Sequence, residues 1–282
     1  MIDYSLSIGI NAYGNGADLA GCVNDALDWS QALKARGAQA HTCTDGQATG
    51  QRIVDLMTEL VATLRRGQTG VITYSGHGTW VPDEDGDELD KRDEALCPVD
   101  LWDRGVIVDD ELLGIFSRRP VGSRLIFISD SCHSGTVSRL AGPLLYHAVD
   151  RRATDQGWDV DTRPVRLARF LAPGTFLKGE RLERAKATGR IVSPAPGRTS
   201  ALLLAGCAEV EYSYDTWFPQ SDGGQRANGA FTRVALDTLA RMPEISTYKN
   251  WFTEIRRGLP SQDYPQTPQL YGTYDQKLWP LF

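Results

Sequence analysis

The stretch GVITYSGHG, at residues 70–78, joins a short apolar run to a turn in which a histidine stands between glycines. A second stretch, RLIFISDSCHSG at residues 124–135, repeats this arrangement with a cysteine in the turn. Short apolar runs that end in turns are typical of buried strands in a parallel sheet. Ligands bind beyond the carboxyl ends of such strands. If the two strands are neighbours, His77 and Cys132 meet at one edge of the sheet.

Strands and helices alternate around these two stretches. Apolar runs predict strands over 4–11, 39–43, 70–74, 124–129 and 201–205. Amphipathic spacing predicts helices over 23–33, 53–64, 110–117 and 231–241. Strands that alternate with helices predict an α/β fold, with a mostly parallel central sheet between two layers of helices. We expect one domain over residues 1–282.

The composition is that of an ordinary globular protein. The chain has 282 residues, of which 41% are hydrophobic, and a formal net charge of -6, which does not suggest a nucleic-acid partner. No apolar run approaches the roughly 20 residues that a membrane span needs, and the N-terminus lacks the features of a signal peptide. We therefore expect a cytoplasmic monomer that does not bind membranes. Its five widely spaced cysteines contain no CxxC pair and should be free thiols.

Two segments interrupt the alternation. Residues 83–111 hold thirteen acidic residues against Lys91, Arg92 and Arg104. Residues 151–198 hold eleven basic residues against five acidic ones, without a clear hydrophobic period. We interpret this basic connection as an exposed, partly mobile loop between a large part, 1–150, and a small part, 199–282.

The residues at the predicted sheet edge suit nucleophilic catalysis by a thiol. A thiol attacks a carbonyl only when deprotonated, and a nearby imidazole promotes this, so His77 is the candidate base for Cys132. The backbone N–H groups of Gly78 and Cys132 are candidates for binding the oxyanion. His133 follows the nucleophile directly, but adjacent side chains in an extended segment point to opposite faces. We interpret His41 and His147, which lie outside any turn motif, as ordinary polar residues.

The paired motifs YSGHG (residues 74–78) and DSCHSG (residues 130–135) resemble those of the metacaspases, including the prokaryotic caspase-like peptidases called orthocaspases. The resemblance covers roughly residues 6–139 well and 201–215 and 229–239 more weakly. It implies a caspase-like three-layer sandwich and a cysteine endopeptidase with the dyad His77 and Cys132.

The resemblance also implies a pocket for the side chain that precedes the cut bond. Its members would be Cys22, Asp25, Ser75 and Asp130. Paired carboxylates favour a guanidinium or ammonium group, so we expect protein or peptide substrates with Arg or Lys before the cut bond. The alternatives are that Asp25 caps a helix and that Asp130 only binds backbone amides. Cys207 and the run Glu209 to Asp215 follow a predicted strand and are candidates for lining the substrate cleft, with Tyr212, Tyr214 and Asp215 as candidate substrate contacts.

Two further properties follow only from the resemblance. Asp93, Asp109 and Asp110 stand where many metacaspases bind an activating calcium ion, and carboxylates suit this cation. Arg139 stands where the family has another acidic residue, which leaves the calcium requirement open, and the acidic segment could simply be a solvated surface. The chemistry itself needs no cofactor. The basic connection could present an Arg or Lys for self-cleavage, or could be a variable surface loop.

The sequence therefore predicts a metacaspase-like cysteine endopeptidase with Arg or Lys specificity. One alternative is a caspase-like binding or scaffold module without activity, which the intact His77 and Cys132 argue against. Another is a related thiol hydrolase with a different cleavage preference, as in the clostripain and gingipain relatives. Peptides that differ only in the residue before the cut bond separate these alternatives.

Overall fold

The structure is a computed structural model that describes residues 1–82, 92–132, 166–180, 182, 201–208 and 211–281, with the short strands β8 (Ala153–Thr154) and β9 (Gly157–Trp158) in addition. Its centre is a six-stranded sheet in the order β14-β11-β7-β3-β1-β2. The strands are β1 (Tyr4–Gly9), β2 (Gln39–Thr44), β3 (Thr69–Ser75), β7 (Arg124–Asp130), β11 (Leu202–Ala205) and β14 (Gln269–Tyr271). All pairs are parallel except that of β14 with β11.

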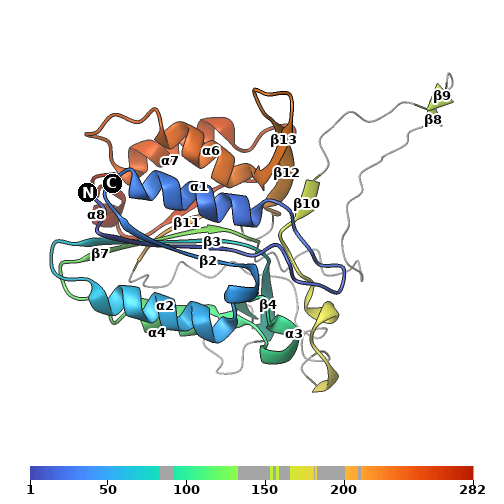
Figure 1. Ribbon diagram of the computed structural model, residues 1–282, viewed down its shortest axis with the longest axis horizontal. Helices are drawn as coiled ribbons and strands as arrows, with labels where there is room; N and C mark the ends of the chain where they lie inside the picture. The colour runs from blue at the N-terminus through green and yellow to red at the C-terminus, as the bar shows by residue number, and fades with distance from the viewer. Residues whose placement is uncertain are drawn as a thin grey trace.

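Helices cover both faces of this sheet (Figure 1). One face carries α1 (Cys22–Lys34), α6 (Ala230–Leu239) and α7 (Tyr248–Gly258). The other face carries α2 (Gly50–Thr63) and α4 (Asp109–Phe116). Short helices are also present, among them η1 (Asp45–Gln47), α3 (Leu101–Arg104), η2 (Pro173–Thr175) and α8 (Tyr274–Lys277).

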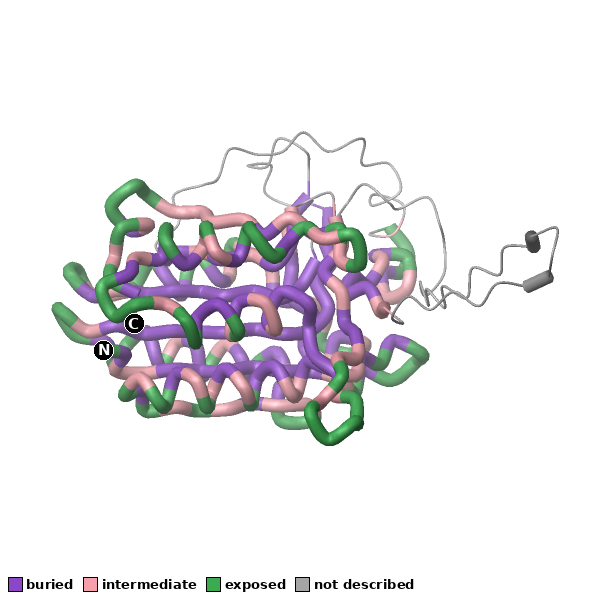
Figure 2. The backbone as a smooth tube through the Cα atoms, turned by 90° about the horizontal axis from the view of Figure 1, so that it is seen from above, coloured by how far each residue is buried: buried purple, intermediate pink, exposed green. Residues whose placement is uncertain are grey.

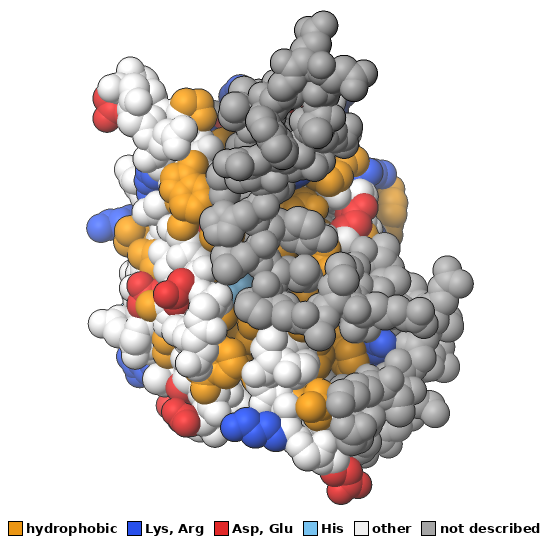
Figure 3. Space-filling model, turned by 90° about the vertical axis from the view of Figure 1, so that its right-hand side faces the viewer, with side chains coloured by type: hydrophobic (Ala, Val, Ile, Leu, Met, Phe, Trp, Pro, Cys, Tyr) orange, Lys and Arg blue, Asp and Glu red, His pale blue; other side chains and the backbone are white. Residues whose placement is uncertain are grey.

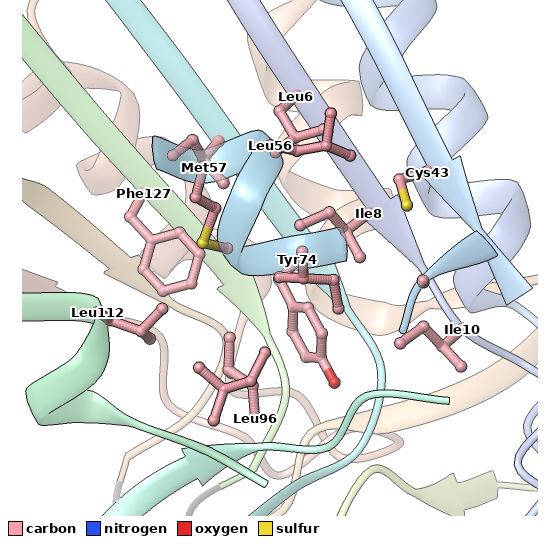
Figure 4. Close-up of a cluster of buried hydrophobic side chains, with 14 of the residues drawn as sticks. Leu6, Ile8, Ile10, Cys43, Leu56, Met57, Tyr74, Leu96, Leu112 and Phe127 are labelled. Carbon is pink, nitrogen blue, oxygen red and sulfur yellow. The ribbon is translucent and has the colours of Figure 1, made fainter. Parts of the chain in front are cut away.

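Each face of the sheet has its own hydrophobic core. Figure 4 shows the core beneath α2, where Leu56 and Met57 meet Ile8, Tyr74 and Phe127 from the sheet. The opposite core is built around Trp29 and Trp251, whose rings pack edge to face with centroids 6.1 Å apart. The strands lie buried between the helices, whose outer faces are exposed (Figure 2). This burial explains why β7 carries a continuous apolar run, LIFI, without alternation.

Two small sheets lie at the end of the central sheet where its parallel strands terminate (Figure 1). One contains β4 (Gly78–Pro82), β5 (Arg92–Leu96) and β6 (Ile107–Val108). The other contains β10 (Arg166–Ala168), β12 (Tyr214–Pro219) and β13 (Gln225–Gly229). They surround the edge where the sequence placed His77 and Cys132.

The structure confirms the three-layer α/β sandwich, and it corrects one prediction. The basic connection was expected to be exposed, yet Arg169, Phe170 and Leu171 are buried. They are buried because they occupy the end of the central sheet, as described below. The sequence also missed α7, β12, β13 and β14, whose apolar patterns are short or interrupted. No helix among the described residues is long and apolar enough to cross a membrane.

Candidate active site

The turns after β3 and β7 bring His77 and Cys132 to the same edge of the sheet. The two strands pair in register, with Ser75 opposite Asp130 at their last residues. The backbones of Gly78 and Cys132 then lie so close that a Cβ on Gly78 would be 2.0 Å from the carbonyl oxygen of Cys132. Only glycine fits at this position. The five cysteines are free thiols, as predicted, and Cys132 is fully buried.

His77 is held in one orientation by its surroundings. Its Nε2 lies 2.7 Å from the carbonyl oxygen of Ala17, and its backbone N–H donates to the hydroxyl of Tyr13. The carbonyl oxygen can only accept, so Nε2 carries the proton and Nδ1 presents a lone pair. Burial lowers the pKa of His77 to about 4, against the smaller opposite effect of the Ala17 carbonyl. The ring is therefore neutral at pH 7 and able to accept a proton at Nδ1.

The sulfur of Cys132 contacts the chain on the far side of the site. The backbone N–H of Ser213 donates to Sγ at 2.5 Å. The thiol of Cys207 is a second neighbour, and its hydrogen bond with Cys132, together with burial, raises the pKa of Cys207. In this arrangement Sγ is not hydrogen-bonded to His77, whose Nδ1 has no hydrogen-bond partner among the described residues.

Arg169, from the basic connection, is buried in the site. Its guanidinium group contacts the carboxylates of Asp25 at 2.6 Å, Asp215 at 2.7 Å and Asp130 at 3.0 Å. Burial alone lowers the pKa of Arg169, but the three carboxylates outweigh it and the pKa is raised. A buried charge is tolerated only when it is paired and hydrogen-bonded in this way.

Further donors hold the three carboxylates in place around the guanidinium group. Asp25 accepts from the side chain of Asn228 at 2.9 Å, and Asp215 accepts from the backbone of Ala20 at 2.7 Å. Asp130 accepts from both the backbone and the hydroxyl of Thr232. Burial raises the pKa of Asp25 to about 7, although Arg169 opposes this shift. The pocket is rigid and strongly acidic.

The carbonyl group of Arg169 is bound as well. Its oxygen accepts from the backbone N–H of Gly78 at 2.9 Å and from that of Cys132 at 3.2 Å. The backbone N–H of Arg169 donates to the carbonyl of Ser213 at 3.0 Å. Both the side chain and the carbonyl of one arginine are therefore fixed beside the candidate nucleophile. Figure 3 views this end of the molecule, where several hydrophobic side chains are visible between polar ones.

Comparisons with known proteins identify the family. The family described as "Metacaspase, peptidase C14 domain" matches residues 4–141. "Metacaspase-1" of Meyerozyma guilliermondii is 30% identical over 97% of this chain and 70% of its own length. The chain belongs to the metacaspase family. "Metacaspase-1" of Coccidioides immitis is 34% identical over 94% of this chain and 60% of its own length.

A solved structure supports the fold of this metacaspase. The crystal structure of a protein from Geobacter sulfurreducens superposes with a TM-score of 0.67 at 26% identity, and the match covers 99% of this chain and 97% of that one. The family match makes the chain a caspase-family cysteine peptidase, and the structural likeness supports its fold. The resemblance seen in its two turn motifs is confirmed.

The structure brings most of the predicted pocket residues of this metacaspase together. Asp25 and Asp130 both contact Arg169, and Cys22 is fully buried, where burial raises the pKa of its thiol and the charge of Arg169 opposes this shift. Ser75 is buried beside Asp130 in the sheet register, and no hydrogen bond joins it to the guanidinium group. Asp25 does not cap its helix, because the N-cap of α1 is Gly21.

Sequence reasoning missed Arg169 and gave Asp215 only a general place in the lining of the cleft. Arg169 stood among eleven basic residues of the connection, and no local motif distinguished it. Asp215 belonged only to a run of candidates after a strand, and its place beside Asp25 depends on the pairing of β12 with β13. The predicted neighbour His133 and the residue Arg139 lie outside the described residues.

The candidate calcium ligands lie away from this pocket. Asp93 is on β5, and Asp109 and Asp110 begin α4, directly after β6. β5 and β6 are antiparallel neighbours, so the three residues come from adjacent elements. Among the described residues, however, no group of three or more acidic, His or Cys side chains could hold a metal ion. Residues 83–91 of the acidic segment lie outside the described part of the chain.

Proposed function

We propose that this metacaspase is an endopeptidase that cuts after Arg or Lys, with Cys132 as nucleophile and His77 as base. The observation that supports this proposal is the binding of Arg169. Its carbonyl oxygen lies between the N–H groups of Gly78 and Cys132, and its side chain lies among three carboxylates. A substrate residue before the cut bond needs both of these contacts.

The proposed reaction uses these groups, and it requires Sγ of Cys132 to turn towards Nδ1 of His77, to which it is not hydrogen-bonded in the structure. The thiol of Cys132 gives its proton to Nδ1 of His77, and Sγ forms a bond to the carbonyl carbon. The oxyanion that develops is stabilised by the N–H groups of Gly78 and Cys132. The imidazolium then protonates the leaving amine as the C–N bond breaks, which leaves a thioester. Water hydrolyses the thioester and restores the thiol.

The acidic pocket is the basis for the proposed specificity. A guanidinium or ammonium group pairs with carboxylates that are otherwise buried without a cation. A neutral side chain would leave these charges unpaired, and an acidic one would add a repulsive charge. Asp25, Asp130 and Asp215 together therefore favour Arg or Lys over every other residue type.

The substrate residues that precede the arginine would add a strand to the enzyme. Arg166, Leu167 and Ala168 form β10, which pairs antiparallel with β12 opposite Thr216, Asp215 and Tyr214. Strand addition binds a peptide through its main chain and leaves alternate side chains to provide selectivity. The same edge of β12 would receive an external peptide.

The bond between Arg169 and Phe170 is the natural first substrate. An uncut chain that keeps Arg169 in the pocket cannot bind another arginine there. We therefore propose that the peptidase cuts itself after Arg169 and that this cut opens the cleft for other substrates.

The decisive experiment compares the wild type with Cys132→Ala, using Cys43→Ala as the matched control because Cys43 is another buried free cysteine. Intact-mass measurement should find fragments 1–169 and 170–282 in the wild type and the control, and only the uncut chain in Cys132→Ala. Reporter peptides that end in Arg or Lys should be cleaved, and those that end in Asp should not. Cutting by Cys132→Ala, or preference for Asp, would contradict the proposal.

Calcium activation by Asp93, Asp109 and Asp110 is a separate proposal, supported by the carboxylate type of the ligands and their adjacent elements. The described residues alone do not complete a site, so no step of the reaction is assigned to the ion. Thermal unfolding of Cys132→Ala with calcium and with a chelator tests it. A rise in melting temperature that Asp109→Asn abolishes supports binding, and no shift contradicts it.

A further inference from the structure

The residue after Arg169 lies in a second site of different chemistry. Phe170 is only 6% exposed. It packs in a cluster with Trp80, Leu177 and Cys207, which also contains Cys132. Its ring lies 6.1 Å from the ring of Tyr212, at an angle of 50°. The described side chains of this cluster are apolar or aromatic, in contrast to the carboxylates around Arg169.

The main chain beyond the arginine is also held. Phe170 forms a parallel bridge with Gly78. The backbone N–H of Leu171 donates to the carbonyl of Gly78 at 3.0 Å, and the hydroxyl of Thr79 donates to the carbonyl of Leu171 at 2.6 Å. β4, which begins at Gly78, therefore aligns the residues that follow the arginine, while β12 aligns those that precede it. Contacts on both sides would fix the bond between Arg169 and Phe170 against Cys132.

We infer that this cluster is a binding site for a large apolar residue, aromatic above all, directly after the cut bond. The inference rests on the proposed function and adds a selectivity to it: the peptidase prefers Arg or Lys followed by an aromatic residue. A small side chain would leave part of the site unfilled, and a charged one would be buried among apolar groups.

Cleavage itself would empty the site. When the bond after Arg169 breaks, the amide nitrogen of Phe170 becomes a charged amino group. Burial of this charge in an apolar environment is unfavourable. Phe170 would therefore leave, and the site would accept the corresponding residue of another substrate.

The test uses the full chain after self-cleavage has finished and a series of internally quenched peptides, Arg-Leu-Ala-Arg-Xaa-Leu, in which Xaa is Phe, Leu, Ala or Asp. We expect kcat/KM for Phe to exceed that for Ala by about tenfold, the scale at which apolar pockets discriminate, with Leu between them and Asp lowest. Equal rates for Phe and Ala would overturn the inference and leave the proposed function intact. Failure to cleave any of the four peptides would overturn both.

A pair of variants locates the site. Tyr212→Ala removes the ring that faces Phe170, and Tyr212→Phe keeps the ring and removes only the hydroxyl. The ratio of kcat/KM between the Phe and Ala peptides should fall towards one in Tyr212→Ala and stay at the wild-type value in Tyr212→Phe. Melting curves confirm that both variants fold. A wild-type ratio in folded Tyr212→Ala would show that this cluster does not hold the residue.

Discussion

Two pockets of opposite character lie on either side of a single peptide bond. Arg169 is surrounded by Asp25, Asp130 and Asp215, whereas Phe170 lies among Trp80, Leu177 and Tyr212. Loss of a partner from a buried ion pair costs about 3–5 kcal/mol, against about 1.5–3 kcal/mol for loss of a buried apolar side chain. The acidic pocket should therefore decide whether a bond is cut, and the apolar pocket should adjust how fast.

The largest effect is expected at Arg169. Arg169→Gln leaves three buried carboxylates without a cation, which should cost about 3–5 kcal/mol of folding free energy and abolish the cut after residue 169. Arg169→Lys keeps the charge and should keep the cut. Chemical denaturation in the Cys132→Ala background measures the loss of folding free energy. Intact mass of the variants that keep Cys132 measures whether the chain is cut after residue 169. Efficient cutting of Arg169→Gln would show that the acidic pocket does not control cleavage.

Removal of one pocket carboxylate should have a smaller but clear effect. Asp25→Asn and Asp215→Asn each remove a direct partner of the guanidinium group, and we expect kcat/KM for arginine peptides to fall by at least about thirtyfold. Asp28→Asn is the matched control, because Asp28 lies on the same helix as Asp25 but pairs with Arg226. If all three variants lose the same activity, the pocket assignment is wrong.

The neutral state of His77 predicts how folding stability and self-cleavage depend on pH. Burial lowers its pKa to about 4 while Arg169 fills the site. The unfolded chain binds a proton at His77 below its ordinary pKa of about 6.5, and the folded chain does so only near pH 4. Folding stability should therefore fall as the pH falls from 6.5 towards 4.

Melting temperatures of Cys132→Ala between pH 4 and pH 7 measure this effect. Addition of His77→Gln should flatten the curve, whereas addition of His41→Gln, at an exposed position on β2, should not. Self-cleavage by the wild type should likewise persist at pH 5.5, where an unperturbed histidine would be mostly protonated. Loss of self-cleavage with a midpoint near pH 6.5 would contradict the buried, neutral ring.

The smallest effect is expected one residue beyond the arginine. Phe170→Ala should slow the cut after Arg169 by about tenfold, and Phe170→Leu should slow it less. The fraction cut is followed over time by intact mass. If Phe170→Ala abolishes the cut as completely as Arg169→Gln, the two pockets do not differ in the way proposed.

The central fold was predictable because its strands are buried on both faces. Continuous apolar runs such as 70–74 and 124–129 are typical of strands buried on both faces. The turns that follow these strands indicate the edge of the sheet where ligands bind. The antiparallel strands β12 and β13 carry polar residues and gain their stability from each other and from α1. The hydrophobic pattern of β12 and β13 in the sequence is therefore too weak to predict either strand.

The candidate site divides in the same way. His77, Cys132, Asp25 and Asp130 lie in the first half of the chain, close to motifs that sequence reasoning can interpret. Asp215 and Arg169 enter the site through long-range pairing, at 46 residues from one another along the chain. No sequence motif next to Asp215 or Arg169 predicts their contact, so only the three-dimensional structure could place both residues in the site.

The strand order of the central sheet has a practical consequence for purification. β11 is hydrogen-bonded between β7, which precedes Arg169 in the chain, and β14, which follows it. After a single cut behind Arg169, fragments 1–169 and 170–282 would therefore remain joined through the central sheet and through the hydrophobic cores on its two faces. The nicked protein should elute from a sizing column as a single particle of unchanged radius, and only denaturing electrophoresis would reveal that it consists of two pieces.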